Sequence, residues 1–187
     1  MTPLQLIPVC FIRPKTPASL FIPGFWLLAF CWLLSACNSS RVRPIDEAGL
    51  QKLIASSSGK VVLVNFWATW CEPCVEEFPD LMKLAREYQP RGLEIIFVSI
   101  DDPEEIDAKV LPFLQAQNVS FRTYIKQVKD DEAFINAIDP KWSGAIPATF
   151  IYDTNGMQVK RLIAQQNFKT FAEAIQPLLP VHKTSND

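Results

Sequence analysis

The sequence is poor in residues that bind metals. Its 187 residues include one histidine, His182, which lies in a polar stretch at the C-terminus. Five cysteines are present, but only Cys71 and Cys74 occur after residue 37. A structural zinc site takes four Cys or His ligands, so one cysteine pair without a second pair or a nearby histidine does not complete it. We therefore expect no metal and no other cofactor.

An excess of basic charge is also lacking. Without Arg13 and Lys15, the two basic residues of the first 37, the 18 basic side chains fall to 16 against 20 acidic ones. A protein that binds nucleic acid through its phosphates normally carries a basic patch and a positive net charge. The weak acidity argues against nucleic-acid binding. Internal repeats and low-complexity tracts are absent as well.

Residues 1–37 are predicted to be a signal peptide, since residues 18–36 are almost wholly apolar or small. The segment ends in Leu34-Ser35-Ala36-Cys37, which resembles the lipobox of bacterial lipoproteins, so Cys37 is the candidate lipidation site. The alternative is an uncleaved signal anchor, because the apolar region is close to spanning length, although Pro23-Gly24 interrupts it. Either segment attaches the protein to a membrane and leaves the following residues outside the cytoplasm.

The rest of the chain divides into three parts. Residues 38–45 are predicted to be a short tether, in which residues 41–45 can supply an edge strand. Residues 46–180 are predicted to form one domain, and residues 181–187 a polar tail.

Strands and helices alternate along the domain. Residues 60–67 and 93–100 are almost continuously apolar, which is typical of strands buried on both faces. Asn155-Gly156 is a strong hairpin signal between two further strands. The order predicts an α/β fold with a mixed sheet covered by helices on both faces. We expect other strands at 121–125, 147–153 and 157–163, and helices at 46–57, 72–88 (bent at Pro79), 104–117 (capped by residues 101–104), 130–138 and 168–179.

Cys71 and Cys74 lie where a buried strand gives way to an amphipathic helix. Free N–H groups and the helix dipole at a helix N-terminus stabilise a thiolate, which is the form that attacks disulfides. Glu72 adds a negative charge that opposes this effect, and Pro73 restricts the turn. The pair therefore indicates reversible dithiol/disulfide chemistry, with a structural disulfide or half a zinc site as alternatives. In an oxidising compartment the pair rests as a disulfide unless a donor reduces it.

Four motifs in this order resemble the thioredoxin superfamily, and within it the membrane-tethered TlpA/ResA-type thiol-disulfide oxidoreductases. They are residues 64–74 (VNFWATWCEPC), residues 77–79 (EFP), residues 145–150 (AIPATF) and residues 153–156 (DTNG). The resemblance covers roughly residues 45–180. It implies a thioredoxin-like three-layer sandwich with a mixed central sheet.

The resemblance also implies roles for individual residues. Cys71 corresponds to the exposed attacking thiol and Cys74 to the resolving thiol. The Ile146-Pro147 bond corresponds to a cis bond beside the disulfide, where the backbone receives the substrate chain. Glu77 matches an acidic residue that assists proton transfer or shapes a partner-binding cavity. Its alternative reading is an exposed first-turn glutamate that satisfies the helix dipole.

Asn65 and three tryptophans complete the candidate site. Asn65 departs from thioredoxin, which has a buried aspartate at this place to handle the proton of the second cysteine. An amide cannot act as that base, so Glu77 or water has to replace it. We expect Trp67 to pack in the core and Trp70 to be exposed and substrate-facing. Trp142 either lines the substrate groove or belongs to a surface excursion without a role.

The resemblance favours a reductase of disulfides in envelope proteins, with apocytochrome c among the candidate substrates and a membrane electron donor. One rival is a copper-delivery module on the same fold, which usually needs a histidine beside a CxxxC spacing. A second rival is a peroxiredoxin-like peroxidase, which normally carries a threonine three residues before its reactive cysteine. Ala68 occupies that place before Cys71, so the hydroxyl is missing.

Overall fold

The computed structural model of the chain describes residues 42–180. The predicted signal peptide or anchor with Cys37, the first part of the tether and the polar tail at 181–187 lie outside the described residues, and their roles stay predictions. Between residues 42 and 180, no helix combines the length and the apolar character needed to cross a membrane.

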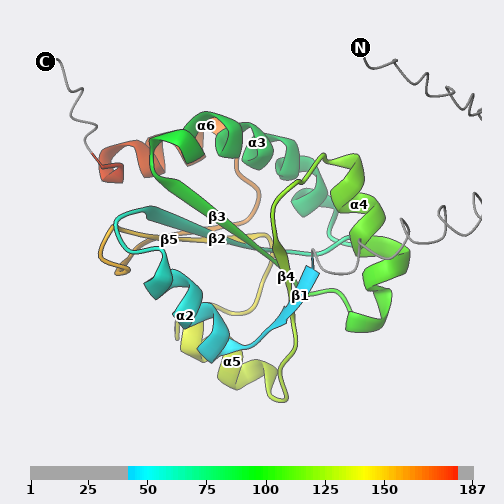
Figure 1. The fold of residues 1–187 in the computed structure, drawn as a ribbon. Coiled ribbons are helices and arrows are strands. Elements are labelled where there is room, and N and C mark those ends of the chain that lie inside the picture. Colours follow the sequence, from blue (N-terminus) through cyan, green and yellow to red (C-terminus); the bar gives the residue numbers. More distant parts are fainter. Residues whose placement is uncertain (1–41, 181–187) are drawn as a thin grey trace, which may run out of the picture. The chain divides into compact units, whose positions relative to one another are not determined.

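A six-stranded mixed sheet forms the middle of the described domain (Figure 1). The strand order is β1-β4-β3-β2-β5-β6, with parallel pairing from β1 to β2 and antiparallel pairing of β5 with both neighbours. The expected edge strand at the start of the domain is confirmed as β1. The strands are β1 (Val42–Ile45), β2 (Val61–Trp67), β3 (Leu93–Ser99), β4 (Thr123–Lys126), β5 (Ala148–Tyr152) and β6 (Gln158–Ile163).

Strand β2 is central and its seven residues are all buried. Its side chains alternate between the two faces of the sheet, because successive residues of a strand point in opposite directions. They therefore enter two separate cores. Val61, Leu63 and Trp67 belong to one core, and Val62, Val64 and Phe66 to the other.

Helices cover both faces of the sheet, which confirms the predicted three-layer architecture (Figure 1). The longest helix, α3, packs on one face together with α4 and α6, and its buried side chains include Phe78 and Leu81. The opposite face is covered by α2 and α5. The bounds are α2 (Glu47–Ser56), α3 (Glu72–Tyr88), α4 (Leu111–Ala116), α5 (Asp131–Ile138) and α6 (Phe168–Ile175).

One local expectation about the helices differs from the structure. The helix expected at 104–117 consists of a 3-10 turn, Pro103–Glu105, a π-helical turn, Ile106–Val110, and only then α4. Pro112 lies in the first turn of α4 and has no N–H to donate to the preceding turn, so the regular α-helical pattern begins there. Pro79, in contrast, lies inside α3 without ending it.

The predicted hairpin joins β5 to β6. Asp153 accepts hydrogen bonds through Oδ1 from the backbone N–H groups of Asn155 and Met157, both at 2.9 Å. Gly156 adopts a φ of 78°, which a glycine reaches without the steric cost that other residues bear. The Asn155-Gly156 signal is therefore confirmed as the turn that fixes the register of β6 against β5.

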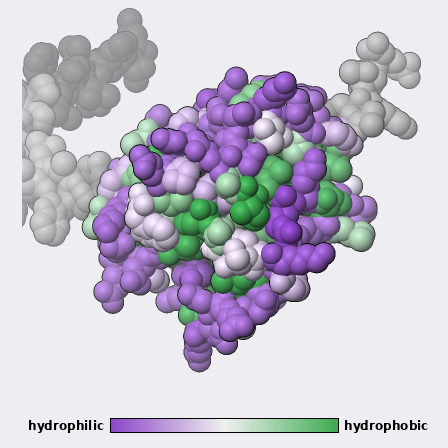
Figure 2. Space-filling view, turned by 180° about the vertical axis from the view of Figure 1, so that it is seen from behind, coloured by the Kyte–Doolittle hydropathy of each residue, from purple (hydrophilic) through white to green (hydrophobic). Residues whose placement is uncertain are grey.

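Strand β6 forms one edge of the sheet. Large hydrophobic side chains are exposed in this strand and in the turn before it, at Met157 (66%), Val159 (46%) and Ile163 (39%). Figure 2 views the molecule from behind. It shows hydrophobic residues gathered near the middle of the face turned toward the viewer, among hydrophilic ones. Lys160 and Arg161 lie in the same strand, and charged residues in an edge strand oppose unwanted pairing with another sheet.

Candidate active site

The two cysteines lie at the junction between β2 and α3. Cys71 is the N-cap residue of α3, and it is bonded to Cys74 in the first turn by a disulfide. The exposed fraction is 6% for Cys71 and zero for Cys74. Cys71 is therefore less exposed than predicted, since both cysteines pack in the core cluster on the α3 face. It is nevertheless the one member of the pair with accessible surface.

Glu72 and Pro73 occupy the first turn of α3 between the cysteines. Pro73 is suited to this position because the first N–H groups of a helix have no partner within the helix, so its missing N–H costs nothing. Glu72 is exposed and lies at the positive end of the helix dipole. The dipeptide thus starts the helix that holds both sulfur atoms.

The Ile146-Pro147 bond is cis, as expected from the motif. Ala148, the next residue, pairs with Phe66 near the C-terminal end of β2, the end from which the chain continues to Cys71. Ile146 packs against the core cluster that contains both cysteines. The antiparallel pairing of β5 with β2 thus brings the proline to the disulfide end of the sheet.

Glu77 is buried, with 2% of its surface exposed. The alternative of an exposed first-turn glutamate is therefore wrong, because Glu77 shares the inward face of α3 with Cys74 and Leu81. Burial raises its pKa from 4.5 to about 7. Hydrogen bonds from the N–H of Gln166 and from Asn65 oppose this rise, and the charge of Asp80 adds to it. A carboxyl group with this pKa exchanges protons near neutral pH.

Asn65 connects Glu77 to the neighbouring strand. Its Nδ2 donates to Glu77 Oε1 at 3.0 Å and to Thr149 Oγ1 at 3.0 Å, while its Oδ1 has no donor among the described residues. Thr149 lies directly opposite Asn65 in the β2–β5 pairing. The cluster therefore joins β2, β5 and α3 below the disulfide, with Glu77 as its one ionisable group.

The tryptophans have different environments. Trp67 is fully buried and packs against Phe78, with a ring-centroid separation of 5.0 Å, so its predicted core role is confirmed. Trp70 is 62% exposed next to Cys71, also as predicted. Trp142 is 5% exposed and packs 4.8 Å from the ring of Phe66 in the core covered by α2 and α5. Neither of the two expected alternatives, a substrate groove or a surface excursion, describes its side chain, because Trp142 fills this core.

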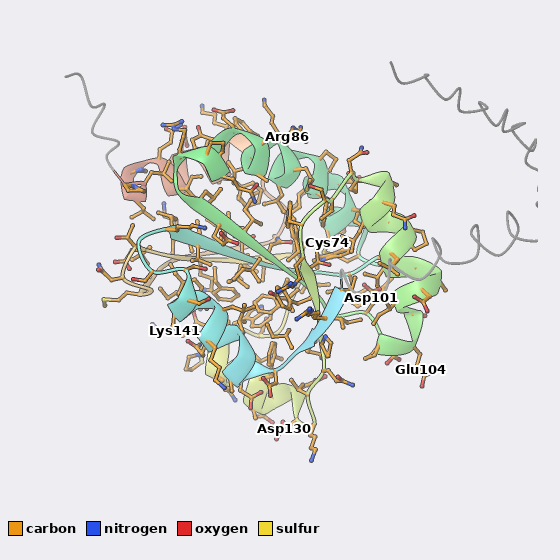
Figure 3. The ribbon with its side chains drawn as sticks, in the orientation of Figure 1. Cys74, Arg86, Asp101, Glu104, Asp130 and Lys141 are labelled. Atoms are coloured by element: carbon orange, nitrogen blue, oxygen red, sulfur yellow. A yellow bond between two sulfur atoms is a disulfide. The ribbon has the colours of Figure 1, made fainter. Side chains whose placement is uncertain are left out.

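Asp101 is a buried residue beside the site whose contacts the sequence pattern did not predict. It is 2% exposed and accepts hydrogen bonds from the backbone N–H of Thr69 at 3.1 Å, from Thr69 Oγ1 at 2.5 Å and from Ser99 Oγ at 2.6 Å. It therefore ties the end of β3 to the segment before Cys71, whereas the sequence suggested a helix cap. Figure 3 shows Asp101 and Cys74 on the same side of the molecule, away from Lys141.

A cavity of about 440 Å³ opens beside this segment. Trp70 forms part of its wall, and the loop after β3 and the start of the β4–α5 connection supply most of the rest. Its charged lining includes Asp102, Asp131 and Lys126, and the last two form an ion pair at 2.7 Å. Across residues 42–180, no group of three or more His, Cys, Asp or Glu side chains is arranged to hold a metal ion.

The sheet order, the disulfide at a helix N-terminus and the neighbouring Ile146-Pro147 bond define a thioredoxin-fold thiol-disulfide oxidoreductase. Residues 45–160 match the AhpC/TSA family, and the chain belongs to this family within the thioredoxin superfamily.

Curated relatives agree with this assignment. The thiol-disulfide oxidoreductase ResA of Geobacillus thermodenitrificans (strain NG80-2) is 32% identical over 136 residues, covering 71% of this chain and 72% of that protein. ResA of Bacillus cereus (strain ZK / E33L) is 30% identical over 142 residues, covering 72% and 73%. The resemblance inferred from the four motifs is confirmed.

Solved structures support the fold. A thiol:disulfide interchange protein of the thioredoxin family from Chlorobium tepidum TLS matches with a TM-score of 0.56 at 23% identity, covering 66% of this chain and 83% of that one. A thiol-disulfide isomerase from Corynebacterium glutamicum matches with a TM-score of 0.57 at 17% identity, covering 70% and 86%. At these identities the likeness extends to the fold alone.

Proposed function

We propose that this oxidoreductase works as a reductase of disulfide bonds in envelope proteins outside the cytoplasm. The exchange mechanism rests on the asymmetry of the cysteine pair, in which Cys71 has accessible surface and Cys74 has none, and the reductase direction rests on the family resemblance. A thiol that attacks a large partner has to be reachable, whereas a thiol that resolves the resulting bond reacts only with its neighbour.

The reaction consists of two exchanges. In the reduced protein the thiolate of Cys71 attacks one sulfur of the partner's disulfide, which forms a mixed disulfide and releases the partner's other sulfur as a thiolate. The thiolate of Cys74 then attacks Cys71, which re-forms the Cys71–Cys74 disulfide and releases the partner's second sulfur. Two electrons pass from this protein to the partner. A dithiol donor at the membrane has to return them before the next cycle.

Glu77 is the proposed acceptor of the Cys74 proton. The two residues lie three positions apart on the same face of α3, and both are buried. With a pKa of about 7, the carboxylate of Glu77 takes up a proton near neutral pH as Cys74 becomes a thiolate. Asn65, where thioredoxin carries aspartate, is an amide and cannot perform this step.

The proposed substrate is an extended segment of a protein that carries a disulfide, bound along the backbone of Ile146 and Pro147. Oxidised apocytochrome c is one candidate. The proposed location outside the cytoplasm is supported by the lipobox-like ending at Cys37, which also supplies the proposed lipid anchor. The named relatives support the exchange chemistry and do not specify the substrate.

A peroxidase activity is the alternative raised by the related fold and the AhpC/TSA match. It is disfavoured because Ala68, three residues before Cys71, offers no hydroxyl beside the sulfur. Consumption of hydrogen peroxide by the reduced protein tests this alternative. A rate comparable to the rate of protein-disulfide reduction would favour it.

Trapping of partners tests the exchange cycle. In Cys74→Ser the mixed disulfide cannot be resolved, so we expect partners from envelope extracts to accumulate as covalent adducts of Cys71. Cys71→Ser is the matched control and should trap few or none. Absence of adducts with Cys74→Ser, or equal adducts with both variants, contradicts the proposal.

The direction of electron flow is tested by the equilibrium reduction potential against glutathione. A reductase should have a potential more negative than about −200 mV, so that it donates electrons to oxidised clients. A value near −120 mV, typical of a strong disulfide donor, would contradict the reductase assignment while leaving the exchange chemistry intact.

A further inference from the structure

The two oxygens of Glu77 have partners of different chemical character. Oε2 accepts from the backbone N–H of Gln166 at 2.9 Å, and Oε1 accepts from Nδ2 of Asn65 at 3.0 Å. A backbone N–H can only donate. A side-chain amide carries a donor at one end and an acceptor at the other, so only the Asn65 contact can be reversed.

This difference decides which oxygen can hold a proton. A proton on Oε2 would point at the N–H of Gln166 and replace a hydrogen bond by a repulsive contact. A proton on Oε1 faces the Asn65 amide, which can rotate by 180° and present Oδ1 in place of Nδ2. The two ends of the amide are nearly equal in size, so the rotation needs no repacking.

The other partner of Asn65 permits the same rotation. Thr149 Oγ1 now accepts from Nδ2 at 3.0 Å, and its hydroxyl can donate instead once Oδ1 faces it. In the present orientation Oδ1 is buried and has no donor among residues 42–180. After rotation Oδ1 accepts from both Glu77 and Thr149, and the NH₂ takes the position that Oδ1 now occupies. The contacts to Glu77 and Thr149 are therefore made in both states, and the other end of the amide is unpaired within the described residues in both.

We propose that Asn65 is a positioning residue whose amide inverts when Glu77 takes up a proton, and that the proton is held on Oε1. The inference rests on the proposed function, in which Glu77 exchanges a proton with Cys74. As a consequence, Asn65 and Thr149 stabilise Glu77 both as a carboxylate and as a protonated acid. Glu77 then gains and loses its proton without rearrangement of the surrounding core.

The charged surroundings of Glu77 come from its own helix. Asp80 acts on it through its charge, Glu76 is adjacent and binds Gln165 Nε2, and Cys74 is the other ionisable group on this face once reduced. Strands β2 and β5 contribute only the neutral Asn65 and Thr149, and the loop before α6 contributes a neutral backbone N–H. Of the two hydrogen bonds that Glu77 accepts among the described residues, only the one from Asn65 can reverse its direction.

Hydrogen-bond scalar couplings in the full-length protein test the inversion. With the disulfide intact, we expect a coupling from Asn65 Nδ2 to Glu77 Cδ above the midpoint of Glu77, and its loss below that midpoint. The coupling from Gln166 N to the same carbon should persist throughout. Persistence of both couplings through the titration, or loss of the Gln166 coupling, overturns the proposal.

Glu77→Gln provides a second measurement. The introduced side chain has one carbonyl oxygen, which the Gln166 N–H binds, so its NH₂ faces Asn65 and locks the inverted amide. We expect the Asn65 amide signals of this variant to match those of the acid form of the wild type and to be constant between pH 4 and 9. A match to the alkaline form overturns the inversion.

Two controls separate the possible failures. Thr123 Oγ1 on β4 is also buried without a partner among the described residues, so Thr123→Val should leave the Asn65 and Glu77 signals unchanged. The exchange activity of Glu77→Gln tests the proposed function separately. Full activity at every pH would remove Glu77 from the reaction, while the couplings would still decide whether Asn65 inverts.

Discussion

Glu77 and Asp101 are both 2% exposed at the disulfide end of the sheet, yet their surroundings differ. Asp101 accepts hydrogen bonds from three separate groups, contributed by Thr69 and Ser99. Among the described residues Glu77 accepts only two, from Asn65 and Gln166, and burial raises its pKa to about 7. Equal burial thus produces two kinds of carboxyl group.

The difference separates a structural role from a chemical one. A carboxylate that accepts several hydrogen bonds holds its donors in place, and its loss leaves those donors unsatisfied. A carboxyl group with fewer donors and a perturbed pKa is suited to proton exchange. We therefore assign Asp101 to the architecture of the segment before Cys71, and Glu77 to the chemistry of the cysteine pair.

Replacement of Asp101 should have the largest effect on stability. Asp101→Ala leaves the buried N–H and hydroxyl of Thr69 and the hydroxyl of Ser99 without their acceptor, so we expect the free energy of unfolding at pH 7 to fall by about 4 kcal/mol. Urea unfolding of the oxidised protein measures this loss. A loss below about 1 kcal/mol would show that water replaces the carboxylate, and would remove the contrast with Glu77.

The pH dependence of stability should reveal Glu77. Its pKa is about 7 when folded against an ordinary value of 4.5, so the folded state binds the extra proton more tightly. The stability of the wild type relative to Glu77→Gln is then highest below pH 4.5 and is lost as the pH rises through 7, by on the order of 3 kcal/mol in total. Urea unfolding of both oxidised proteins between pH 4 and 8 provides the measurement. A constant difference would place the folded pKa of Glu77 near its ordinary value.

Local patterns in the sequence predicted most of the fold. The apolar runs of β2 and β3, the Asn155-Gly156 turn and the amphipathic face of α3 are properties of neighbouring residues, and each was identified from them. The π-helical turn at Ile106–Val110 was not identified, although Pro112, which follows it and lacks an N–H, is visible in the sequence.

The polar cluster of Asn65, Thr149 and Glu77 could not be predicted from such local patterns. The pairing of Asn65 with Thr149 joins residues 84 positions apart and exists only once β5 pairs antiparallel with β2. Gln166 reaches Glu77 across 89 positions. One local signal was overlooked: Glu77 follows Cys74 by three residues and precedes Leu81 by four, a spacing that places it on the buried face of α3.

Replacement of Trp70 should have the smallest effect on stability, although Trp70 directly follows Thr69, which donates hydrogen bonds to Asp101. It is 62% exposed, so Trp70→Ala should change the free energy of unfolding by less than about 0.5 kcal/mol. Exposed tryptophans are frequent anchors at protein interfaces, so we expect KM for a protein disulfide substrate to rise about tenfold, which corresponds to about 1.4 kcal/mol. The value of kcat, and the rate with a small disulfide, should remain the same.

Met157→Ala is the matched control for Trp70→Ala, because Met157 is equally exposed, at 66%, but lies in the β5–β6 hairpin turn. It should leave KM unchanged. If both variants raise KM, a general loss of hydrophobic surface explains the effect. If neither does, Trp70 does not contact the substrate. The hydrogen bonds of Asp101 with Thr69 and Ser99 then hold the chain that leads into Cys71 and do not present a binding surface.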